Sequence, residues 1–438
     1  MHVEISGKEK INSFLAGIFV GLLLLAVVLY QIPAVQDRFS WRIDFAMAYA
    51  RGLIDPVRPM PTPDVSAVGA AEVILPEPTT ASTPTPAPSL TAEGLMATAQ
   101  PSAATPTITQ TPLPTLTPTQ IPGSARLTPP KWEKQEVNNC GPATLSMFLH
   151  FYNWEGDQST ISDSIKPKRE DRNVNVEELV SYVNTESPGL EIQYRVGGDI
   201  DTLKRLIAAG YPVMIEEAFL MAESYWMNDD RWSGHYLLLT GYDDELKTFT
   251  VQDAFVGANQ KLPYQAIDEP WRFFNRVYIM LYPPEDRPII QSILGDQWDA
   301  NTNREHALAL AQKEIDADPT DSYAWFNLGT NLVYFEKYSQ AAKAYDEARK
   351  AGLPQRMLRY QFGPFFAYFH TGRNDDLIAL TEYALKITPN SEEAMLWQGW
   401  ALYRKGNRDE AVKLFQQALE ARPEYSDANY ALNFVQTH

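Results

Sequence analysis

The chain has 438 residues, which corresponds to about two or three domains of ordinary size. Its hydrophobic content of 45% is enough for globular cores, while its formal net charge of -18 argues against nucleic acid as a partner, because phosphate binding requires clustered Lys and Arg. The six histidines lack the spacing of a metal site and no glycine-rich phosphate-binding loop occurs, so we expect neither a metal nor another cofactor.

An apolar segment near the N-terminus predicts a membrane anchor. Residues 14–30 read FLAGIFVGLLLLAVVLY and contain no charged residue. With its flanks this run is long enough to cross a bilayer as a helix, so we expect a transmembrane helix at residues 13–32 and a short cytoplasmic segment at 1–12. The alternative is a cleaved signal peptide, which normally has a shorter apolar region of about 7–15 residues.

The next segment is rich in Pro, Thr, Ser and Ala. Between Pro78 and Ser124 its only charged residue is Glu93, and it has too few bulky apolar side chains to build a core. We therefore expect a juxtamembrane segment and a disordered linker over residues 33–127. Stalks of this composition usually stand outside the cell, so we predict a single-pass protein of the cell membrane with extracytoplasmic C-terminal domains; a cytoplasmic disordered linker is the alternative.

Residues 128–284 alternate between helical and strand patterns, which predicts an α+β domain. Helices are expected directly after Cys140, at residues 176–184 and from Asp199 to Gly210. Strands are expected at residues 211–215, in HYLLLTGY from residue 235 and in TFTVQDAF from residue 248.

Cys140 is the only cysteine and stands where a nucleophilic thiol is expected. A lone cysteine forms neither an internal disulfide nor a multi-thiolate metal site, so it is either an inert buried residue or a reactive thiol. Pro142 suits the first turn of a helix, and apolar residues follow with helical spacing from Leu145 onward. Cys140 therefore begins a helix, where unpaired N–H groups and the helix dipole stabilise an anion such as a thiolate.

The strands expected from residues 235 and 248 would form a hairpin, which carries His235 on its first strand and Asp253 on its second. If this hairpin is centred near Glu245, Asp253 lies opposite Leu237 and diagonal to His235 on the same face of the sheet. A register slip of one residue would send one of the two side chains to the other face. The pairing of His235 with Asp253 is therefore a prediction that depends on the register.

These residues together suit acyl transfer. A thiolate attacks a carbonyl, a histidine accepts the thiol proton and later protonates the leaving amine, and a carboxylate orients the imidazole. The oxyanion that forms needs hydrogen-bond donors, for which the backbone N–H of Cys140 and the side chain of Gln135 are candidates. Nearby, Tyr225, Trp226 and Trp232 either line a substrate cleft or pack in the interior.

The short motifs around these positions together resemble the peptidase C39-like family, whose members are cysteine peptidases with a papain-like fold. The matching positions are Gln135, residues 139–145 (NCGPATL), 209–213 (AGYPV), 234–236 (GHY), 241–243 (GYD) and 251–253 (VQD). The resemblance covers most of residues 131–283. It implies that Cys140 is the nucleophile, His235 the general base and acid, Asp253 the orienting carboxylate and Gln135 the oxyanion donor.

This resemblance implies hydrolysis of a peptide or amide bond through a thioester at Cys140. Two alternatives remain: an inactive domain that only binds a peptide, and a transamidase or deamidase that uses the same three groups. In each case a peptide or protein is the expected ligand.

A period of 34 residues appears in the last third of the chain. It relates Gly372 to Gly406 and Pro389 to Pro423. The pattern resembles a tetratricopeptide repeat array, so we expect an all-α solenoid of helix–turn–helix units over residues 285–438. Pro364 falls within an expected first helix, which should be kinked or shortened there. Such arrays bind peptides or partner proteins on a concave face, so we expect a protein partner; a rigid spacer or a dimer contact is the alternative.

Overall fold

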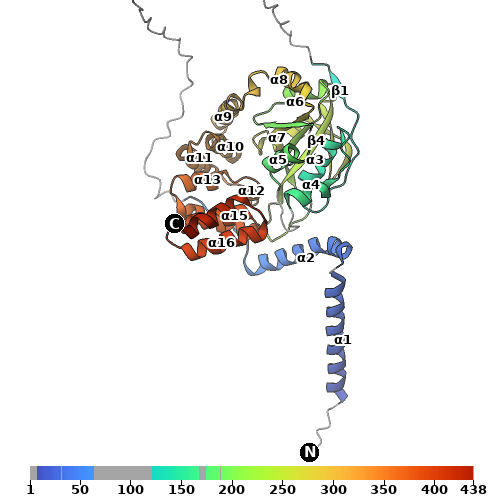
Figure 1. Ribbon diagram of the computed structural model, residues 1–438, viewed down its shortest axis with the longest axis vertical. Helices are drawn as coiled ribbons and strands as arrows, with labels where there is room; N and C mark the ends of the chain where they lie inside the picture. The colour runs from blue at the N-terminus through green and yellow to red at the C-terminus, as the bar shows by residue number, and fades with distance from the viewer. Residues whose placement is uncertain (1–6, 31, 64–120, 167–173, 188, 438) are drawn as a thin grey trace, which may run out of the picture.

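The computed structural model describes residues 7–30, 32–63, 121–166, 174–187 and 189–437. These residues form two N-terminal helices, an α+β domain built on an antiparallel sheet, and a C-terminal array of helices (Figure 1). The predicted fold class, an α+β domain followed by helical repeats, is confirmed at this level. The part of the expected disordered linker at residues 64–120 lies outside the described residues.

Two helices precede the domains, α1 (Gly7–Tyr30) and α2 (Pro33–Ile54). Helix α1 projects away from the body, whereas α2 lies against it (Figure 1). In the described part of the chain no helix combines the length and the apolar character needed to cross a membrane, so the transmembrane helix predicted at residues 13–32 is not supported. The first turn of α1 carries the charged residues Lys8, Glu9 and Lys10.

The segment expected over residues 33–127 has regular structure at both of its ends. After α2, the chain from Asp55 to Pro61 runs along the helical array, where Arg349 donates to the carbonyl of Pro61 and Lys386 pairs with Asp55 at 2.6 Å. At the other end, β1 (Ser124–Arg126) joins the sheet beside β4. The prediction of a linker therefore does not hold at either end, because both ends make contacts with distant residues.

A seven-stranded antiparallel sheet forms the centre of the α+β domain, with the strand order β2-β7-β3-β4-β5-β6 and β1 beside β4. The strands are β2 (Glu191–Arg195), β3 (Val213–Leu220), β4 (Trp232–Asp243), β5 (Thr248–Asp253), β6 (Gly257–Pro263) and β7 (Tyr278–Tyr282). One face packs on α3 (Cys140–His150), α4 (Gln158–Ile165) and α5 (Val176–Glu186). The other packs on α6 (Ile200–Ala208), α7 (Tyr264–Arg272) and α8 (Arg287–Leu294).

The central strand β4 is apolar on both faces because helices cover both sides of the sheet. Tyr236 and Leu238 point into the core with α3 to α5, whereas Leu237 and Leu239 point into the core with α6 to α8. This explains why the strand reads as a continuous apolar run and not as an alternating one. A strand buried in this way holds its register strongly, which matters for the polar residues that it carries.

A β-bulge interrupts the pairing of β4 with β5. Leu237 lies opposite Asp253 and Leu239 opposite Val251, but the next pair is Gly241 with Thr250, so Thr240 is the additional residue. Counting back from the turn without a bulge would place Asp253 opposite Leu238, on the wrong face. The bulge therefore produces the register that the sequence analysis predicted at the far end of the hairpin.

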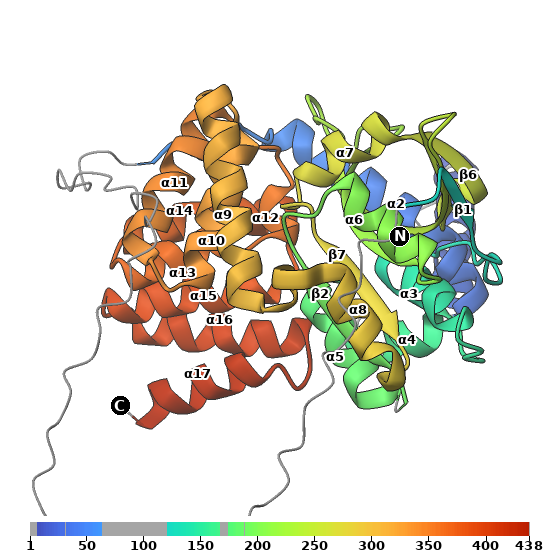
Figure 2. The ribbon, with the colours of Figure 1, turned by 90° about the horizontal axis from the view of Figure 1, so that it is seen from above.

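The C-terminal part is an array of antiparallel helices beside the sheet domain (Figure 2). After the short helices η2 (Pro284–Asp286) and η3 (Gly295–Trp298), the array consists of α9 (Ala300–Ala317), α10 (Ser322–Tyr334), α11 (Tyr338–Ala351), α12 (Met357–Tyr360), α13 (Gly363–His370), α14 (Asn374–Ile387), α15 (Glu392–Arg404), α16 (Arg408–Ala421) and α17 (Ser426–Thr437). Small residues allow close pairing: a Cβ at Gly329 in α10 would lie 2.7 Å from the ring of Tyr345 in α11. Pro364 stands in the first turn of α13, which has only 8 residues, so the predicted shortening is observed.

The loop between β3 and β4 fastens the two domains together. Asp229 in this loop accepts two hydrogen bonds from Arg356, at 2.6 and 2.7 Å, and both side chains are almost fully buried. Trp226 donates its ring N–H to Gln355 at 2.8 Å, and the Arg356 guanidinium lies 4.1 Å from its ring centroid. The helical array therefore packs directly on the loop that leads into His235.

Candidate active site

The thiol of Cys140 stands at the first residue of α3, as predicted. Residues 141–149 of this helix are buried, while Cys140 itself is half-buried. The N-cap residue Asn139 makes no side-chain capping bond. Its side chain therefore does not occupy the first N–H groups of the helix, which lie at the end that carries the thiol. The local sequence places the thiol in a position that favours an anion.

His235 and Asp253 form a buried pair. The ring Nε2 of His235 lies 2.9 Å from Oδ1 of Asp253, and the two residues are 4% and 6% exposed. The same carboxylate oxygen accepts the backbone N–H groups of Phe255 at 2.7 Å and Val256 at 3.0 Å. Because an ionised carboxylate can only accept, Nε2 carries a proton and Nδ1 is the ring nitrogen that remains for the thiol.

The charges in the pair stabilise each other. Burial lowers the pKa of His235, but hydrogen bonds to Asp253 and Cys140, and the charges of both, outweigh this and raise it to about 10. Burial raises the pKa of Asp253, yet the hydrogen bond and charge of His235 and the two backbone donors lower it overall. Cys140 and His235 line the same cavity, and a thiolate at Cys140 would favour the protonated form of His235.

The segment before α3 places Gln135 beside the thiol. Its backbone N–H donates to the carbonyl of Ala254 at 2.9 Å, and the ring N–H of Trp132 donates to the carbonyl of Asp253 at 2.9 Å. The side-chain Oε1 of Gln135 is buried and has no hydrogen-bond partner among the described residues. The two hydrogen bonds to the carbonyl groups of Asp253 and Ala254 therefore hold the segment of Gln135 in place, while its side-chain Oε1 makes no hydrogen bond with the described residues.

Gln158, which sequence reasoning missed, holds this segment together. Its Oε1 accepts from the backbone N–H of Glu136 at 2.7 Å and from the side chain of Asn139 at 2.9 Å. Its Nε2 donates to Glu133 at 2.9 Å and to the carbonyl of Lys134 at 2.8 Å. A glutamine at the start of a short helix has no sequence signal that would reveal such a role.

The thiol opens into a cavity of about 450 Å³. Cys140, His235 and Gln135 line it, whereas Asp253 lies behind His235 and does not. Aromatic side chains form much of the remaining wall, and they come from distant parts of the chain: Phe45 of α2, Phe219 of β3, Tyr225, Phe255 and Tyr360 of α12. Of the three aromatic residues left open by the sequence, Tyr225 lines this cavity, and Trp226 and Trp232 are buried at the contact with the array.

Two adjacent carboxyl groups of β3 lie next to these residues. Glu216 lines the cavity with Cys140, and Glu217 lies directly opposite His235 in the β3–β4 pairing. They are 6% and 8% exposed. Sequence reasoning missed both, although two acidic residues inside the apolar run VMIEEAFL are the kind of pattern that signals buried carboxyl groups. Within the described residues, no group of three or more His, Cys, Asp or Glu side chains is arranged to hold a metal ion.

Comparison with known families agrees with this architecture. Residues 124–282 match the model of the family described as Peptidase_C39 like, and residues 392–425 match that of the tetratricopeptide repeat. The chain therefore contains a C39-like domain followed by tetratricopeptide repeats, as the sequence motifs predicted. A search of curated proteins found no match.

Solved structures resemble parts of this chain. A C39-like peptidase from Bacillus anthracis has 16% identity and a TM-score of 0.30 over 36% of this chain and 96% of its own. Xylellain, a cysteine protease from Xylella fastidiosa, has 16% identity and a TM-score of 0.29 over 37% of this chain and 87% of its own. MamA has 14% identity and a TM-score of 0.28 over 31% of this chain and 78% of its own.

Proposed function

We propose that this protein is a cysteine peptidase that hydrolyses a peptide or amide bond through a thioester at Cys140. The observation that carries the proposal is the buried His235–Asp253 pair, 2.9 Å apart, in which His235 lines the same cavity as a thiol at a helix N-terminus. The family match of residues 124–282 supports the same reaction class.

The first half of the reaction forms the thioester. The Cys140 thiolate adds to the carbonyl carbon of the substrate, and the resulting oxyanion accepts hydrogen bonds from the N–H of Cys140 and the amide of Gln135. When the tetrahedral adduct collapses, the C–N bond breaks and the His235 imidazolium gives its proton to the leaving amine. Asp253 keeps the ring oriented, because the Nε2–H bond leaves Nδ1 directed at the thiol.

The second half releases the acid. Neutral His235 removes a proton from water, the hydroxide adds to the thioester carbonyl, and the C–S bond breaks. The product carboxylic acid leaves and Cys140 is regenerated with its proton shared with His235. Replacement of water by an amine would make the same enzyme a transamidase, so the accepting nucleophile distinguishes these two functions.

The reactivity of Cys140 tests this proposal. We expect iodoacetamide to label Cys140 at pH 6 faster than it labels a free thiol, and we expect His235→Ala to remove this advantage while His150→Ala retains it. His150 is the control because it lies on the same helix, outside the cavity of the thiol, and its Nε2 lies 2.7 Å from the carbonyl of Gly156. Labelling no faster than a free thiol in the folded wild-type protein would contradict the proposal.

Turnover tests the reaction class. The full chain should cut members of a peptide library, and Cys140→Ala should abolish this cleavage. Cleavage that survives the substitution would assign the reaction to another nucleophile. Incorporation of an added amine into a glutamine-containing peptide, with the chain uncut, would instead establish a transamidase.

The helical array is proposed as the site that holds a protein partner or the substrate. Its support is the match of residues 392–425 to a repeat family and the direct contact of the array with the loop that precedes His235. An inactive peptide-binding protein would retain this binding and lack the Cys140-dependent cleavage described above.

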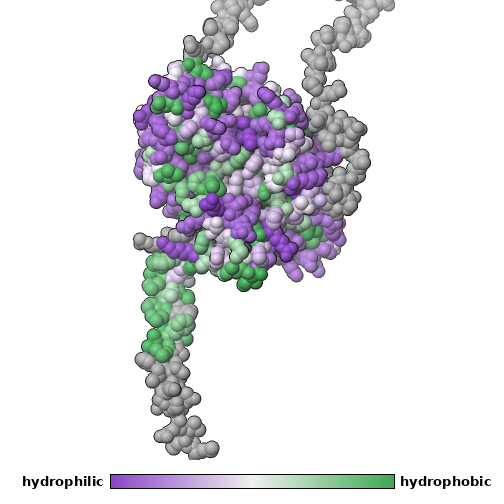
Figure 3. Space-filling model, turned by 180° about the vertical axis from the view of Figure 1, so that it is seen from behind, coloured by the Kyte–Doolittle hydropathy of each residue, from purple (hydrophilic) through white to green (hydrophobic). Residues whose placement is uncertain are grey.

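We also propose that the N-terminal helix attaches the protein to the cell membrane, with the two domains outside the cytoplasm. The support is that α1 stands clear of the body and exposes large apolar side chains in its part nearer the body (Figure 3), among them Phe19, Leu22, Leu24 and Val28. The full chain should sediment with membranes after an alkaline wash, and a chain that lacks residues 1–32 should not. Equal recovery of both in the soluble fraction would overturn the attachment.

A further inference from the structure

A second cavity lies between the C39-like domain and the helical array. Its volume is about 790 Å³. One wall comes from α5, β2 and β3, and the other from helices of the array, including Tyr334 of α10, Phe366 of α13 and Trp397 of α15. Tyr334 and Phe366 are 40% and 37% exposed although both are large, so aromatic surface is available inside this cavity.

This interdomain cavity meets the cavity of the thiol at two residues, Glu216 and Tyr360, which line both. Tyr360 is fixed at the junction because its hydroxyl lies 2.7 Å from that of Ser233. Its ring also packs over the residue before His235: a Cβ at Gly234 would lie 3.1 Å from this ring. The repeat array thus contributes a wall to the thiol cavity, and a ligand held against the array can reach Cys140 without leaving the protein surface.

The interdomain cavity carries more acidic than basic side chains. Its five carboxyl residues are Glu177, Glu178, Glu216, Glu393 and Asp427, and its two basic residues are Arg304 and Arg422. Arg422 forms an ion pair with Glu178, so these two charges compensate each other and four carboxyl residues remain beside Arg304. The potential in the cavity therefore favours a cationic ligand and opposes an acidic one.

Among the carboxyl residues of the interdomain cavity, Glu216 is the one that also lines the cavity of Cys140. It is 6% exposed and lies opposite Tyr236 in the sheet, and within the described residues it has no ion pair with Lys, Arg or His. Burial raises the pKa of Glu216 well above its usual value, the charges of Cys140 and Glu177 raise it further, and the nearby Tyr236 hydroxyl opposes this only in part. A buried carboxyl without a counter-cation gains most from a ligand that brings one.

We propose that the interdomain cavity is the channel that holds an extended substrate peptide, and that Glu216 selects a Lys or Arg side chain of this peptide next to the bond that Cys140 attacks. Aromatic residues of the array contact the apolar part of the peptide, and Tyr360 guides the chain toward the thiol. The identity of the reacting bond rests on the proposed peptidase function, whereas the selection of a basic side chain rests on the cavity alone.

Binding tests the selection without turnover. The probe is a fluorescein-labelled pool of random peptides that carry one Arg, and the control pool carries citrulline, which has the same shape without the charge, in its place. In fluorescence anisotropy with the full chain carrying Cys140→Ala, we expect the Arg pool to bind about tenfold more tightly. Adding Glu216→Gln, which preserves shape, should make the two pools equal, while adding Glu245→Gln in the exposed hairpin turn should preserve the difference.

Equal binding of the two pools, or a difference that survives Glu216→Gln, would overturn the selection. Trp397 of α15 lines the interdomain cavity but not the cavity of the thiol. Trp397→Ala should weaken binding of the long pool and leave a labelled Arg tripeptide unaffected; a uniform effect on both would overturn the channel. Thermal unfolding of each variant checks that the fold is retained.

Cleavage separates this inference from the proposed function. With Cys140 present, mass spectrometry of the cut pool should place Lys or Arg beside the new termini. Cysteine-dependent cleavage without this preference would overturn the inference and leave the peptidase function standing. Glu216-dependent binding with no cleavage would leave the selection standing and overturn the peptidase function.

Discussion

Glu217 and His235 lie directly opposite each other in the pairing of β3 with β4, and Oε2 of Glu217 is buried without a hydrogen-bond partner among the described residues. Burial raises the pKa of Glu217 to about 8; the charge of Asp253 adds to this shift and that of His235 opposes it. Around neutral pH the side chain is therefore a neutral acid in contact with a charged pair. The raised pKa of Glu217 therefore makes the free energy of unfolding depend on pH.

Glu217→Gln should remove part of the pH dependence of folding. Because the native state holds this proton up to about pH 8 and an unfolded chain releases it near 4.5, native Glu217 binds the extra proton between these values. The free energy of unfolding should therefore fall as pH rises through this window, by at most about 1.4 kcal/mol per pH unit for one group. Urea unfolding at several pH values measures the slope, which should be smaller in the variant.

The comparison of variants isolates Glu217 from its neighbours. Glu216 and His235 also have raised pKa values and contribute slopes of the same sign, and the lowered pKa of Asp253 acts only in acid. These contributions are shared by the wild type and by Glu217→Gln, so their difference reports Glu217. Glu245→Gln should keep the wild-type slope; an identical slope in Glu217→Gln would refute the argument.

Asp253→Asn should reduce hydrolysis by about a thousandfold or more, since an uncharged amide neither stabilises the imidazolium nor enforces one tautomer. The loss should appear in kcat, because Asp253 does not line the cavity. Steady-state kinetics on a cleaved library peptide measures it. Asp163→Asn, an exposed position on α4, is the matched control, and a loss confined to KM would show that Asp253 has another role.

Gln158→Glu should slow both alkylation of Cys140 and hydrolysis by about tenfold or more. A carboxylate retains the acceptor for Glu136 and Asn139 but loses both Nε2 donors and places a like charge beside Glu133. Because Gln158 acts by positioning the segment that carries Gln135, kcat should fall more than thermal stability alone explains. Gln158→Ala should lower both kcat and the melting temperature. A variant with normal kcat and a reduced melting temperature would mean that Gln158 contributes only to the stability of the fold.

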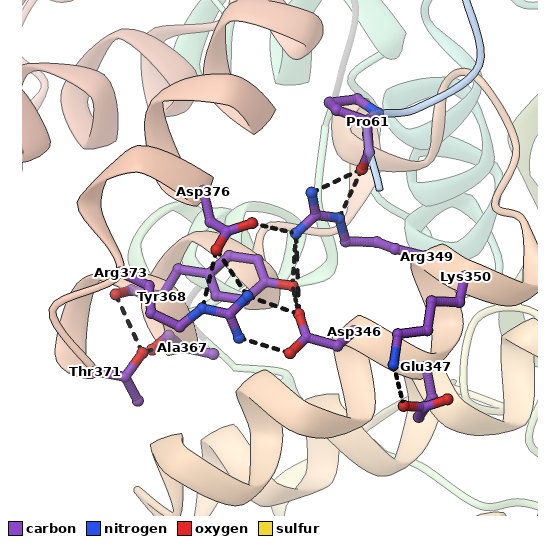
Figure 4. A network of polar contacts seen from close by, with 10 residues as sticks. All are labelled: Pro61, Asp346, Glu347, Arg349, Lys350, Ala367, Tyr368, Thr371, Arg373 and Asp376. Carbon is purple, nitrogen blue, oxygen red and sulfur yellow. Dashed lines mark hydrogen bonds and ion pairs between the residues drawn. The ribbon is translucent and has the colours of Figure 1, made fainter. Parts of the chain in front are cut away.

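Arg349 and Lys350 are neighbours on α11 that should differ strongly in stability effect. Arg349 donates to the Pro61 carbonyl at 2.9 and 2.7 Å, to Tyr368 and to Asp376, and its side chain is 1% exposed (Figure 4). Arg349→Ala removes one donor of the buried Asp376, which keeps its pair with Arg373, and should cost about 2–3 kcal/mol of unfolding free energy.

Lys350→Ala is the control for that substitution. Lys350 pairs with Glu347 at 2.7 Å on the surface, with side chains 43% and 46% exposed, so its loss should cost about 1 kcal/mol or less. Urea unfolding compares the two. Limited proteolysis should also cut near residues 55–63 faster in Arg349→Ala only; equal behaviour of the two variants would show that the contact with Pro61 does not hold this segment.

The hairpin that carries His235 and Asp253 shows how much of the site could be predicted from the sequence. The pairing of Leu237 with Asp253, predicted from a hairpin centred near Glu245, is confirmed. The bulge at Thr240 could not be predicted, because it depends on how both faces of β4 are packed. Without that bulge, the register set at the turn would have separated the two residues.

The N-terminal region shows the opposite case. Composition alone indicated a linker after the apolar segment, yet α2 packs on the body and brings Phe45 to the wall of the thiol cavity. The ring of Phe45 packs against that of Tyr225, 180 positions further along the chain, and no local pattern in either segment reveals this contact. The predicted transmembrane helix likewise rested on local hydropathy and has no support in the described helices.

Sequence by itself determined the features that depend on neighbours along the chain. The helix that begins at Cys140, the repeat helices and the shortening at Pro364 all follow from local periodicity and from the restricted backbone of proline. Tertiary structure alone decided which distant groups meet: Glu216 and Glu217 beside the thiol and the histidine, Gln158 under the loop, and Tyr360 at the junction of two cavities. The physical reason is that burial and neighbouring charges are properties of the folded environment, which the residue type alone does not determine.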